Sequence, residues 1–155
     1  MKRIFLIPLL AIAVACASAP ISTKQTVVNS FQATTNFLAS AQTLERSYCF
    51  NSPATESGTH CTNPLAAQIK LTDALHVRMA TFFNDAFTIA IAAGPALIAW
   101  QPGSPTPTTV TQYLADVTTL LSTVQTLDPA AAPLVSQLQS AANTGATIAT
   151  SLGVK

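Results

Sequence analysis

Few residues in this chain of 155 could take part in catalysis. The histidines are His60 and His76, and His76 follows Asp73 by three residues, so His76 and Asp73 could pair on one helix face. A catalytic Asp–His arrangement would also need a nucleophile, and no serine stands in a Gly-x-Ser-x-Gly turn. We therefore expect a surface or half-buried helix pair, and no catalytic residues.

One further acidic residue, Asp85, lies among Phe82, Phe83 and Phe87. It is either an acid with a raised pKa or, as we favour, the polar edge of an apolar helix. Phosphate-binding loops, dinucleotide fingerprints and EF-hand spacing are absent from the sequence. The sequence thus predicts a protein that is not an enzyme and holds no cofactor. An unrecognised enzyme or a small-ligand-binding bundle is the alternative.

The N-terminus has the pattern of an export signal. Lys2 and Arg3 precede an apolar run from Ile4 to about Ala13, and small residues follow. About 12 helical residues reach about 18 Å, which is short of a hydrocarbon core of about 30 Å. A cleaved signal peptide is therefore favoured over a permanent membrane span.

Ala13-Val14-Ala15-Cys16 resembles a lipobox, the cleavage motif of bacterial prolipoproteins. The family prefers leucine where Ala13 stands. The resemblance implies cleavage before Cys16, acylation of that cysteine, and an anchored domain facing the periplasm; Ala17 is compatible with sorting to the outer membrane. Ordinary cleavage before Ser18 or Pro20 would instead give a soluble periplasmic or secreted protein.

With Cys16 assigned to lipid, Cys49 and Cys61 remain as a pair. In an oxidising compartment they would form a disulfide around a polar loop. Closing a ring of about 13 residues should stabilise the fold by about 3 kcal/mol. Zinc binding by Cys49, His60 and Cys61 is the alternative. Adjacent histidine and cysteine chelate poorly and a fourth ligand is missing, so we favour the disulfide and predict no metal site.

Charged residues make up 8% of the chain, against about 25% in average proteins. The formal net charge is +1, and it becomes −1 when Lys2 and Arg3 are removed with the signal. No basic stripe exists, so nucleic acid is excluded as an expected partner. The expected partners are the membrane, through the anchor, and an envelope protein; no oligomeric state is predicted.

Apolar residues repeat at helical spacing between proline-marked breaks. Asn63-Pro64, Thr106-Pro107 and Asp128-Pro129 each have the pattern of a helix start, although Pro133 blurs the last one. The expected helices cover about 22–48, 64–93, 107–127 and 129–152, with Gly94-Pro95 ending or kinking the second and 96–100 adding a turn. The predicted fold is all-α, an up-down antiparallel bundle of about four helices preceded by a signal-peptide helix.

Residues 86–100 lack charge and end in a tryptophan. A central bundle helix explains this pattern best, with Phe87, Ile91 and Trp100 as candidate contacts to a membrane or partner. Small residues in the last helix predict tight packing or, alternatively, a docking seam: Ala141, Ala142, Gly145, Ala146 and Ala149.

The expected organisation is a signal peptide at 1–15, a lipid-anchored tether at 16–21 and one helical domain at 22–155. In general style the domain resembles the small uncharacterised helical lipoproteins of bacteria and prophages. The predicted function is a non-enzymatic, membrane-tethered structural or interaction module of the cell envelope. The alternative is a membrane-active factor, phage-derived or toxin-like, that works through residues 86–100.

Overall fold

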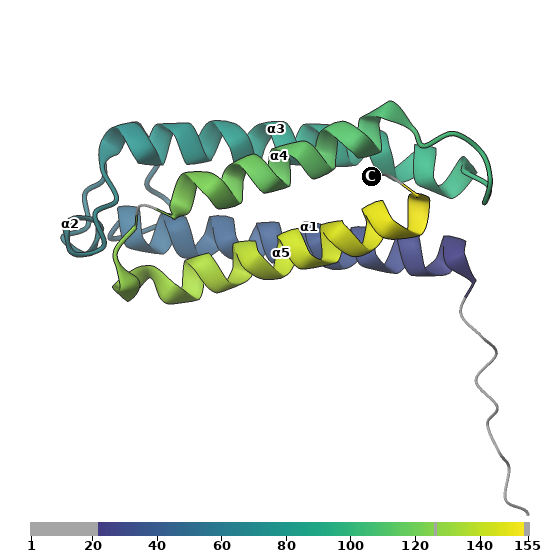
Figure 1. Cartoon of the computed structure of the whole chain (residues 1–155). Helices are drawn as coiled ribbons and strands as arrows, with labels where there is room; N and C mark the ends of the chain where they lie inside the picture. Colours follow the sequence, from purple (N-terminus) through teal and green to yellow (C-terminus); the bar gives the residue numbers. More distant parts are fainter. Residues whose placement is uncertain (1–21, 126, 154–155) are drawn as a thin grey trace, which may run out of the picture.

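The computed structural model describes residues 22–125 and 127–153, and within these ranges it contains helices and no strand (Figure 1). Four long helices carry the fold, which confirms the predicted all-α bundle. Cys16 and the expected signal lie outside the described residues. The elements are α1 (Thr23–Cys49), α2 (Leu65–Gln68), α3 (Asp73–Ala99), α4 (Thr108–Val124), the 3-10 helix η1 (Pro129–Ala131) and α5 (Ala132–Leu152).

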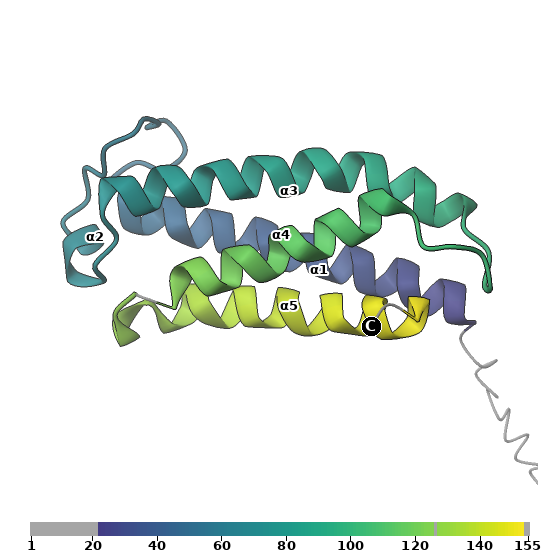
Figure 2. The same cartoon turned by 45° about the horizontal axis from the view of Figure 1, so that its top comes forward.

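Successive long helices run in opposite directions, as Figures 1 and 2 show. α1 packs against α3 and α5, and α4 packs against the same two helices, so the four form a closed ring around one core. One end of the bundle carries the disulfide loop, α2 and η1; we call it the disulfide end. The other end carries the start of α1 at Ser22 and the 100–107 loop, and we call it the Ser22 end.

The core is built from residues at three- and four-residue spacing on each helix. On α1 the buried stripe comprises Val27, Phe31, Thr34, Leu38 and Ala41, and it continues through Glu45 and Cys49, while Tyr48 is half-buried. The largest fully buried side chains include Tyr113, Phe83 and Leu38. Trp100 covers the core at the Ser22 end. Its side chain is 7% exposed, and its indole N–H donates to the Ser104 carbonyl at 3.2 Å.

Two hydroxyl–hydroxyl contacts join neighbouring helices inside the bundle. The Thr34 and Thr144 hydroxyls lie 2.8 Å apart and join α1 to α5. The Tyr113 hydroxyl lies 3.0 Å from Thr35 Oγ1, and burial raises the pKa of Tyr113 to about 12. These contacts satisfy polar atoms that would otherwise destabilise the core.

The second expected helix differs from the structure. In place of one helix over about 64–93, α2 ends after four residues and α3 begins at Asp73. Lys70 adopts a left-handed backbone with φ 60°, while the Leu71 and Lys70 N–H groups donate to the Ala66 and Ala67 carbonyls at 2.8 and 3.2 Å. This is a Schellman stop, which usually carries glycine at the left-handed position. Lysine there hides the stop from sequence analysis.

Pro95 and Pro133 disturb their helices less than the sequence suggests. Gly94-Pro95 was expected to end or kink the second helix, with 96–100 adding a turn; α3 does not end there but continues through this turn to Ala99, with Pro95 inside it and exposed. Pro95 removes one backbone donor, and the surrounding packing tolerates the loss. At the last helix, the Asp128 side chain accepts from Ala130 N–H at 3.2 Å and caps η1, and α5 follows with Pro133 in its first turn.

The small residues of the last helix pack within the bundle at Gly145. A Cβ at this position would lie 3.2 Å from Leu114 Cδ2 of α4, tighter than ordinary contact. The missing side chain of Gly145 therefore allows the close approach of α5 to α4, while Ala142, Ala146 and Ala149 line a groove of about 120 Å³ beside this contact.

The boundary at Thr72 gives a direct test of this fold. Thr72 Oγ1 accepts from Leu75 N–H at 3.2 Å, so Thr72→Ala removes an N-cap and should lower the free energy of unfolding by about 1 kcal/mol. Thr88→Ala is the matched control, because Thr88 lies inside α3 and bonds back to the Asn84 carbonyl at 2.8 Å. It should be neutral or slightly stabilising, because alanine is the better helix former. Urea unfolding that ranks the two variants the other way would contradict the boundary.

Candidate functional site

The disulfide end concentrates the chemistry of the molecule. Cys49, the last residue of α1, bonds to Cys61 across 12 residues, with 4.4 Å between their Cα atoms. The Thr62 and Asn63 N–H groups both donate to the Cys49 carbonyl, at 2.8 and 2.9 Å. The structure therefore brings together the expected cysteine pair, and it fastens the loop to the end of α1.

Arg46 organises the inside of this loop. Its guanidinium donates to the Pro53 carbonyl at 2.5 Å and to the Glu56 carbonyl at 2.6 Å, and it lies 5.3 Å from the centre of the Phe50 ring. One charged side chain thus satisfies two loop carbonyls and stacks on an aromatic face. The loop is held by a covalent bond at its ends and by Arg46 in its middle.

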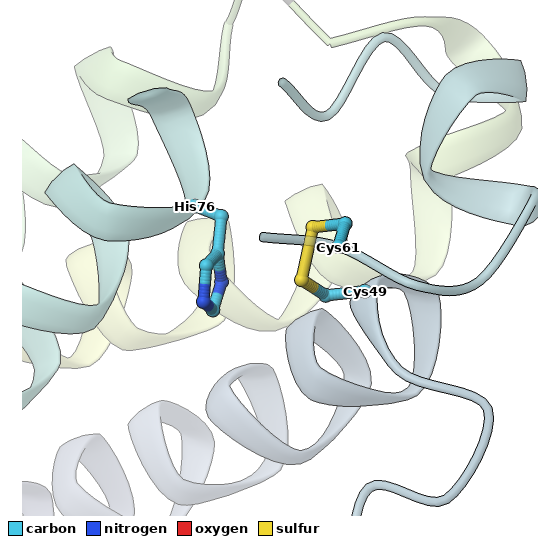
Figure 3. Close-up of side chains that lie close together, drawn as sticks. All are labelled: Cys49, Cys61 and His76. Carbon is cyan, nitrogen blue, oxygen red and sulfur yellow. A yellow bond between two sulfur atoms is a disulfide. The ribbon is translucent and has the colours of Figure 1, made fainter. Parts of the chain in front are cut away.

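A buried histidine–glutamate pair lies beside the disulfide. His76 Nδ1 lies 2.5 Å from Glu45 Oε1, and the two side chains are 4% and 1% exposed. His76 Nε2 lies 3.0 Å from the Gly58 carbonyl. One imidazole therefore connects α1, α3 and the disulfide loop, and Figure 3 shows it projecting from α3 alongside the two cysteines.

The protonation of this pair follows from its acceptors. Since Nε2 faces a carbonyl, it must carry a hydrogen and donate. A second proton then lies between Nδ1 and Oε1, whether the pair is an imidazolium with a carboxylate or a neutral imidazole with a carboxylic acid. Burial raises the pKa of Glu45, while the hydrogen bond and charge of His76 and the charge of Arg46 act in the opposite direction.

The expected pairing of His76 with Asp73 is wrong. Asp73 is the first residue of α3, and its carboxylate turns to the loop, where Oδ2 lies 2.7 Å from His60 Nδ1 and Oδ1 accepts from Cys61 N–H at 2.8 Å. The hydrogen bond from His60 and then that from Cys61 N–H lower the pKa of Asp73. His76 faces the core instead, one turn farther along the helix.

Three potential metal ligands meet at this end of the bundle. The ligand atoms of Cys49, Cys61 and His76 lie within 4.8 Å of one another. The sequence alternative for zinc used His60, which lies against Asp73 instead. In the oxidised chain the two sulfurs are bonded to each other, and both His76 nitrogens have protein partners. Metal binding here would need thiolates, and hence a reduced protein.

Comparison with known proteins finds no match to a family model, a curated protein or a solved structure.

A surface depression of about 570 Å³ lies beside the loop. Both of its lining hydroxyl groups are engaged in the fold, because Thr62 Oγ1 donates to Glu56 Oε2 at 2.5 Å and Thr72 Oγ1 caps α3. The Asp73 carboxylate, also on its wall, accepts from His60 and from Cys61 N–H. These polar groups hold the loop in place.

The remaining candidate residues lie on α3 and directly after it. Phe87 is half-buried, and Ile91 is 78% exposed. Trp100 differs from the expectation of a surface contact, because it is buried against the 100–107 loop. Asp85 is exposed, as expected for the polar edge of a helix. On α4, burial and then the charge of Asp85 raise the pKa of Asp116.

By length and composition, α3 could cross a membrane, alone among the helices of 22–125 and 127–153. The same property is common in core helices of soluble proteins. Seven residues of α3 face the bundle interior at helical spacing, and one of them is the paired His76. This core position accounts for part of its composition, while Ile91 and Ile98 remain exposed.

Sequence reasoning missed Glu45 and Arg46. Glu45 occupies a core position, four residues after Ala41 and four before Cys49, so a charged residue interrupts an otherwise apolar stripe. A charged residue at a core position predicts a buried partner that carries the opposite charge or shares a proton with it. The partner, His76, lies 31 residues away in sequence, beyond the reach of a local pattern.

The raised pKa of Glu45 predicts a pH dependence with a definite sign. A native pKa above the unfolded value means that the contribution of Glu45 is fully present below about pH 4.5 and falls as pH rises through the native pKa. The stability of the wild-type chain relative to Glu45→Gln should therefore decrease with rising pH. Urea unfolding between about pH 3 and about pH 8 measures this slope.

Asp73→Asn supplies the opposite sign in the same experiment. The pKa of Asp73 is lowered, so its contribution is present above about pH 3.8 and falls as pH drops through the native value. Equal slopes for the two comparisons would contradict this assignment of charges.

Proposed function

We propose that this protein is an exported bacterial lipoprotein, a helical module tethered to the cell envelope through Cys16. Residues 1–15 act as the signal peptide, residues 16–21 as the tether, and 22–155 as one non-enzymatic domain. The observation that carries the proposal is the Cys49–Cys61 disulfide. Structural disulfides form and persist in oxidising compartments such as the periplasm, and are rare in the cytosol.

The properties of the bundle support a structural or binding role. The polar side chains of the disulfide end are engaged in closing the loop: Arg46 bonds to carbonyls, His76 to Glu45, and His60 to Asp73. These contacts favour a rigid display scaffold over a reaction centre. Its expected partner is another protein of the envelope.

A membrane-active factor is the second candidate, favoured by the composition of α3. Insertion of this helix would expose its buried face and break the contact of His76 with Glu45. Leakage of dye from vesicles distinguishes the two candidates, because a closed bundle should leave vesicles intact.

Membrane partitioning tests the proposed anchor. In a bacterial host, the wild-type chain should incorporate labelled fatty acid and fractionate with membranes, because two or more acyl chains give stable attachment. Cys16→Ala should lose both the label and the membrane association. A Cys16→Ala chain that still fractionates with membranes would overturn the anchor. The matched control is the double variant Cys49→Ala/Cys61→Ala, which should keep the fatty-acid label and the membrane association.

A further inference from the structure

One half of α3 carries large apolar side chains that no part of the bundle covers. Ile91 is 78% exposed and Ile98 is 67% exposed. They are seven residues apart, which places them on one face of the helix, about 10 Å apart along its axis. Between them lies Pro95, also exposed. Beside Ile98, a shallow groove of about 120 Å³ runs between α1 and α3, with Val28 and Leu97 in its wall.

The charged residues that the structure describes lie mainly at the disulfide end, away from Ile91 and Ile98. Of ten, Lys24 alone lies near the Ser22 end, and Asp85 and Asp116 lie near the middle of their helices. The other seven lie at or near the disulfide end: Glu45, Arg46, Glu56, Lys70, Asp73, Arg78 and Asp128. Among the described residues, the exposed isoleucines therefore lie on a part of the molecule with few charged groups, so little loss of ionic hydration opposes contact with lipid.

The chain enters the domain at this same end. The first residues of α1 and the last turns of α3 lie side by side in both views, and Val28 and Ile98 line one groove (Figures 1 and 2). Five residues lie between Cys16 and Ser22, and the six steps along the chain can span at most about 20 Å. An anchor at Cys16 would hold the uncharged end within this distance of the bilayer, with the charged end farther away.

We infer that the exposed face of α3 formed by Ile91, Pro95 and Ile98 rests on the surface of the bilayer that holds the anchor. This inference depends on the proposed lipoprotein function and adds an orientation to it. Both isoleucines can touch lipid only if the bundle leans, because an upright bundle would lift Ile91 about 10 Å above Ile98. Lys24 can extend its amine to the lipid headgroups while its methylenes stay near the apolar surface.

The occupant is lipid because the tether supplies it at high local concentration. Two isoleucines give too little apolar area for stable binding from solution, but a contact within an anchored molecule needs much less. The face has no basic cluster, so the contact should form equally on zwitterionic and anionic lipid.

A site-specific fluorophore tests the contact. The full-length lipidated chain is placed in phosphatidylcholine vesicles after labelling of Ile91→Cys, Ile98→Cys or Val77→Cys with a polarity-sensitive thiol probe. Val77 is the matched control, because it is 39% exposed and follows the same helical stripe, about 21 Å from Ile91 along the axis. Probes at 91 and 98 should shift to shorter wavelength and be quenched by nitroxide lipids, while the probe at 77 should do neither.

A second variant measures the strength of the contact. Adding Ile91→Asp to the chain labelled at Ile98→Cys should lower the contact equilibrium by about ten- to one hundred-fold, the loss expected for one buried isoleucine. Both residues are exposed, so these changes leave the fold intact.

The parent chain separates failure of the contact from failure of the anchor. It should take up no thiol probe, because Cys16 is acylated and Cys49 is bonded to Cys61. Label at Cys16 overturns the anchor, and the contact that depends on the anchor is overturned with it. An anchored chain whose probes at 91 and 98 match that at 77 overturns the contact alone. The same spectral shift in concentrated protein without lipid also overturns it, since a second copy would then cover the face.

Discussion

Replacing His76 with alanine should lower the free energy of unfolding by about 3 to 5 kcal/mol, the largest single effect expected in this molecule. The variant leaves the Glu45 side chain, 1% exposed, without the imidazole that lies 2.5 Å from it. It also leaves the Gly58 carbonyl without its donor and removes the ring that packs edge-on against Phe50. Urea unfolding of the oxidised chain at neutral pH measures the loss.

His60→Ala is the matched control for that experiment. His60 also contacts a carboxylate, at 2.7 Å from Asp73, but its side chain is 82% exposed. Exposed pairs contribute little, so this variant should unfold close to the wild type. A His76→Ala chain that unfolds at the same urea concentration as His60→Ala would show that the buried pair does not hold α1, α3 and the loop together.

An apolar double variant separates a missing partner from missing packing. Glu45→Met/His76→Phe fills similar volume without charge and should recover most of the loss, because replacing both members of a buried pair is often neutral. Glu45→Met alone should destabilise, since it leaves His76 Nδ1 unpaired. The double-variant cycle then gives the coupling between the two residues.

The second large effect concerns the disulfide. Replacing Cys49 and Cys61 by serine should lower the free energy of unfolding by about 3 kcal/mol, from the loss of a ring that joins residues 12 apart. A reductant should shift the wild-type chain toward the unfolding midpoint of the double variant and leave the variant unchanged. Wild-type midpoints that are equal with and without reductant would contradict a stabilising disulfide.

The effects of His76→Ala and of losing the disulfide on the free energy of unfolding should not be additive. The disulfide fixes the loop whose Gly58 carbonyl accepts from His76, and the two cysteine sulfurs lie within 4.8 Å of a ring nitrogen of that histidine. Neighbouring residues that share a loop couple by about 0.5 to 3 kcal/mol. His76→Ala should therefore cost less in the disulfide-free chain than in the wild type.

The four long helices could be predicted because apolar residues repeat at helical spacing along most of their length. Val27, Phe31 and Leu38 mark the core face of α1, and Val110, Tyr113 and Val117 mark that of α4, each from spacing alone. The disulfide followed from counting cysteines, given the resemblance that assigns Cys16 to lipid. These features are local or compositional, and local patterns suffice for them.

What could not be predicted depends on contacts distant in sequence or on unusual residues. The stop before Thr72 uses lysine in a left-handed conformation, where glycine is the usual marker. His76 seemed to pair with Asp73, three residues away, because a helical neighbour is visible in sequence and Glu45 is not. Tryptophan is typical of membrane interfaces, so Trp100 suggested a surface contact. In the structure Trp100 is buried, and its indole N–H donates to the Ser104 carbonyl of the following loop.

The intact mass of the protein made in a bacterium from its full sequence tests the central claim most directly. The account predicts a chain that begins at Cys16, carries the added mass of a diacylglyceryl group and an amide-linked acyl chain, and lacks two hydrogens for the Cys49–Cys61 bond. Selective ester hydrolysis should lower this mass by the two ester-linked acyl groups alone and leave the amide-linked acyl chain in place. A chain that retains residues 1–15, or one that begins at Ser18 without lipid, would contradict a lipid-anchored envelope protein.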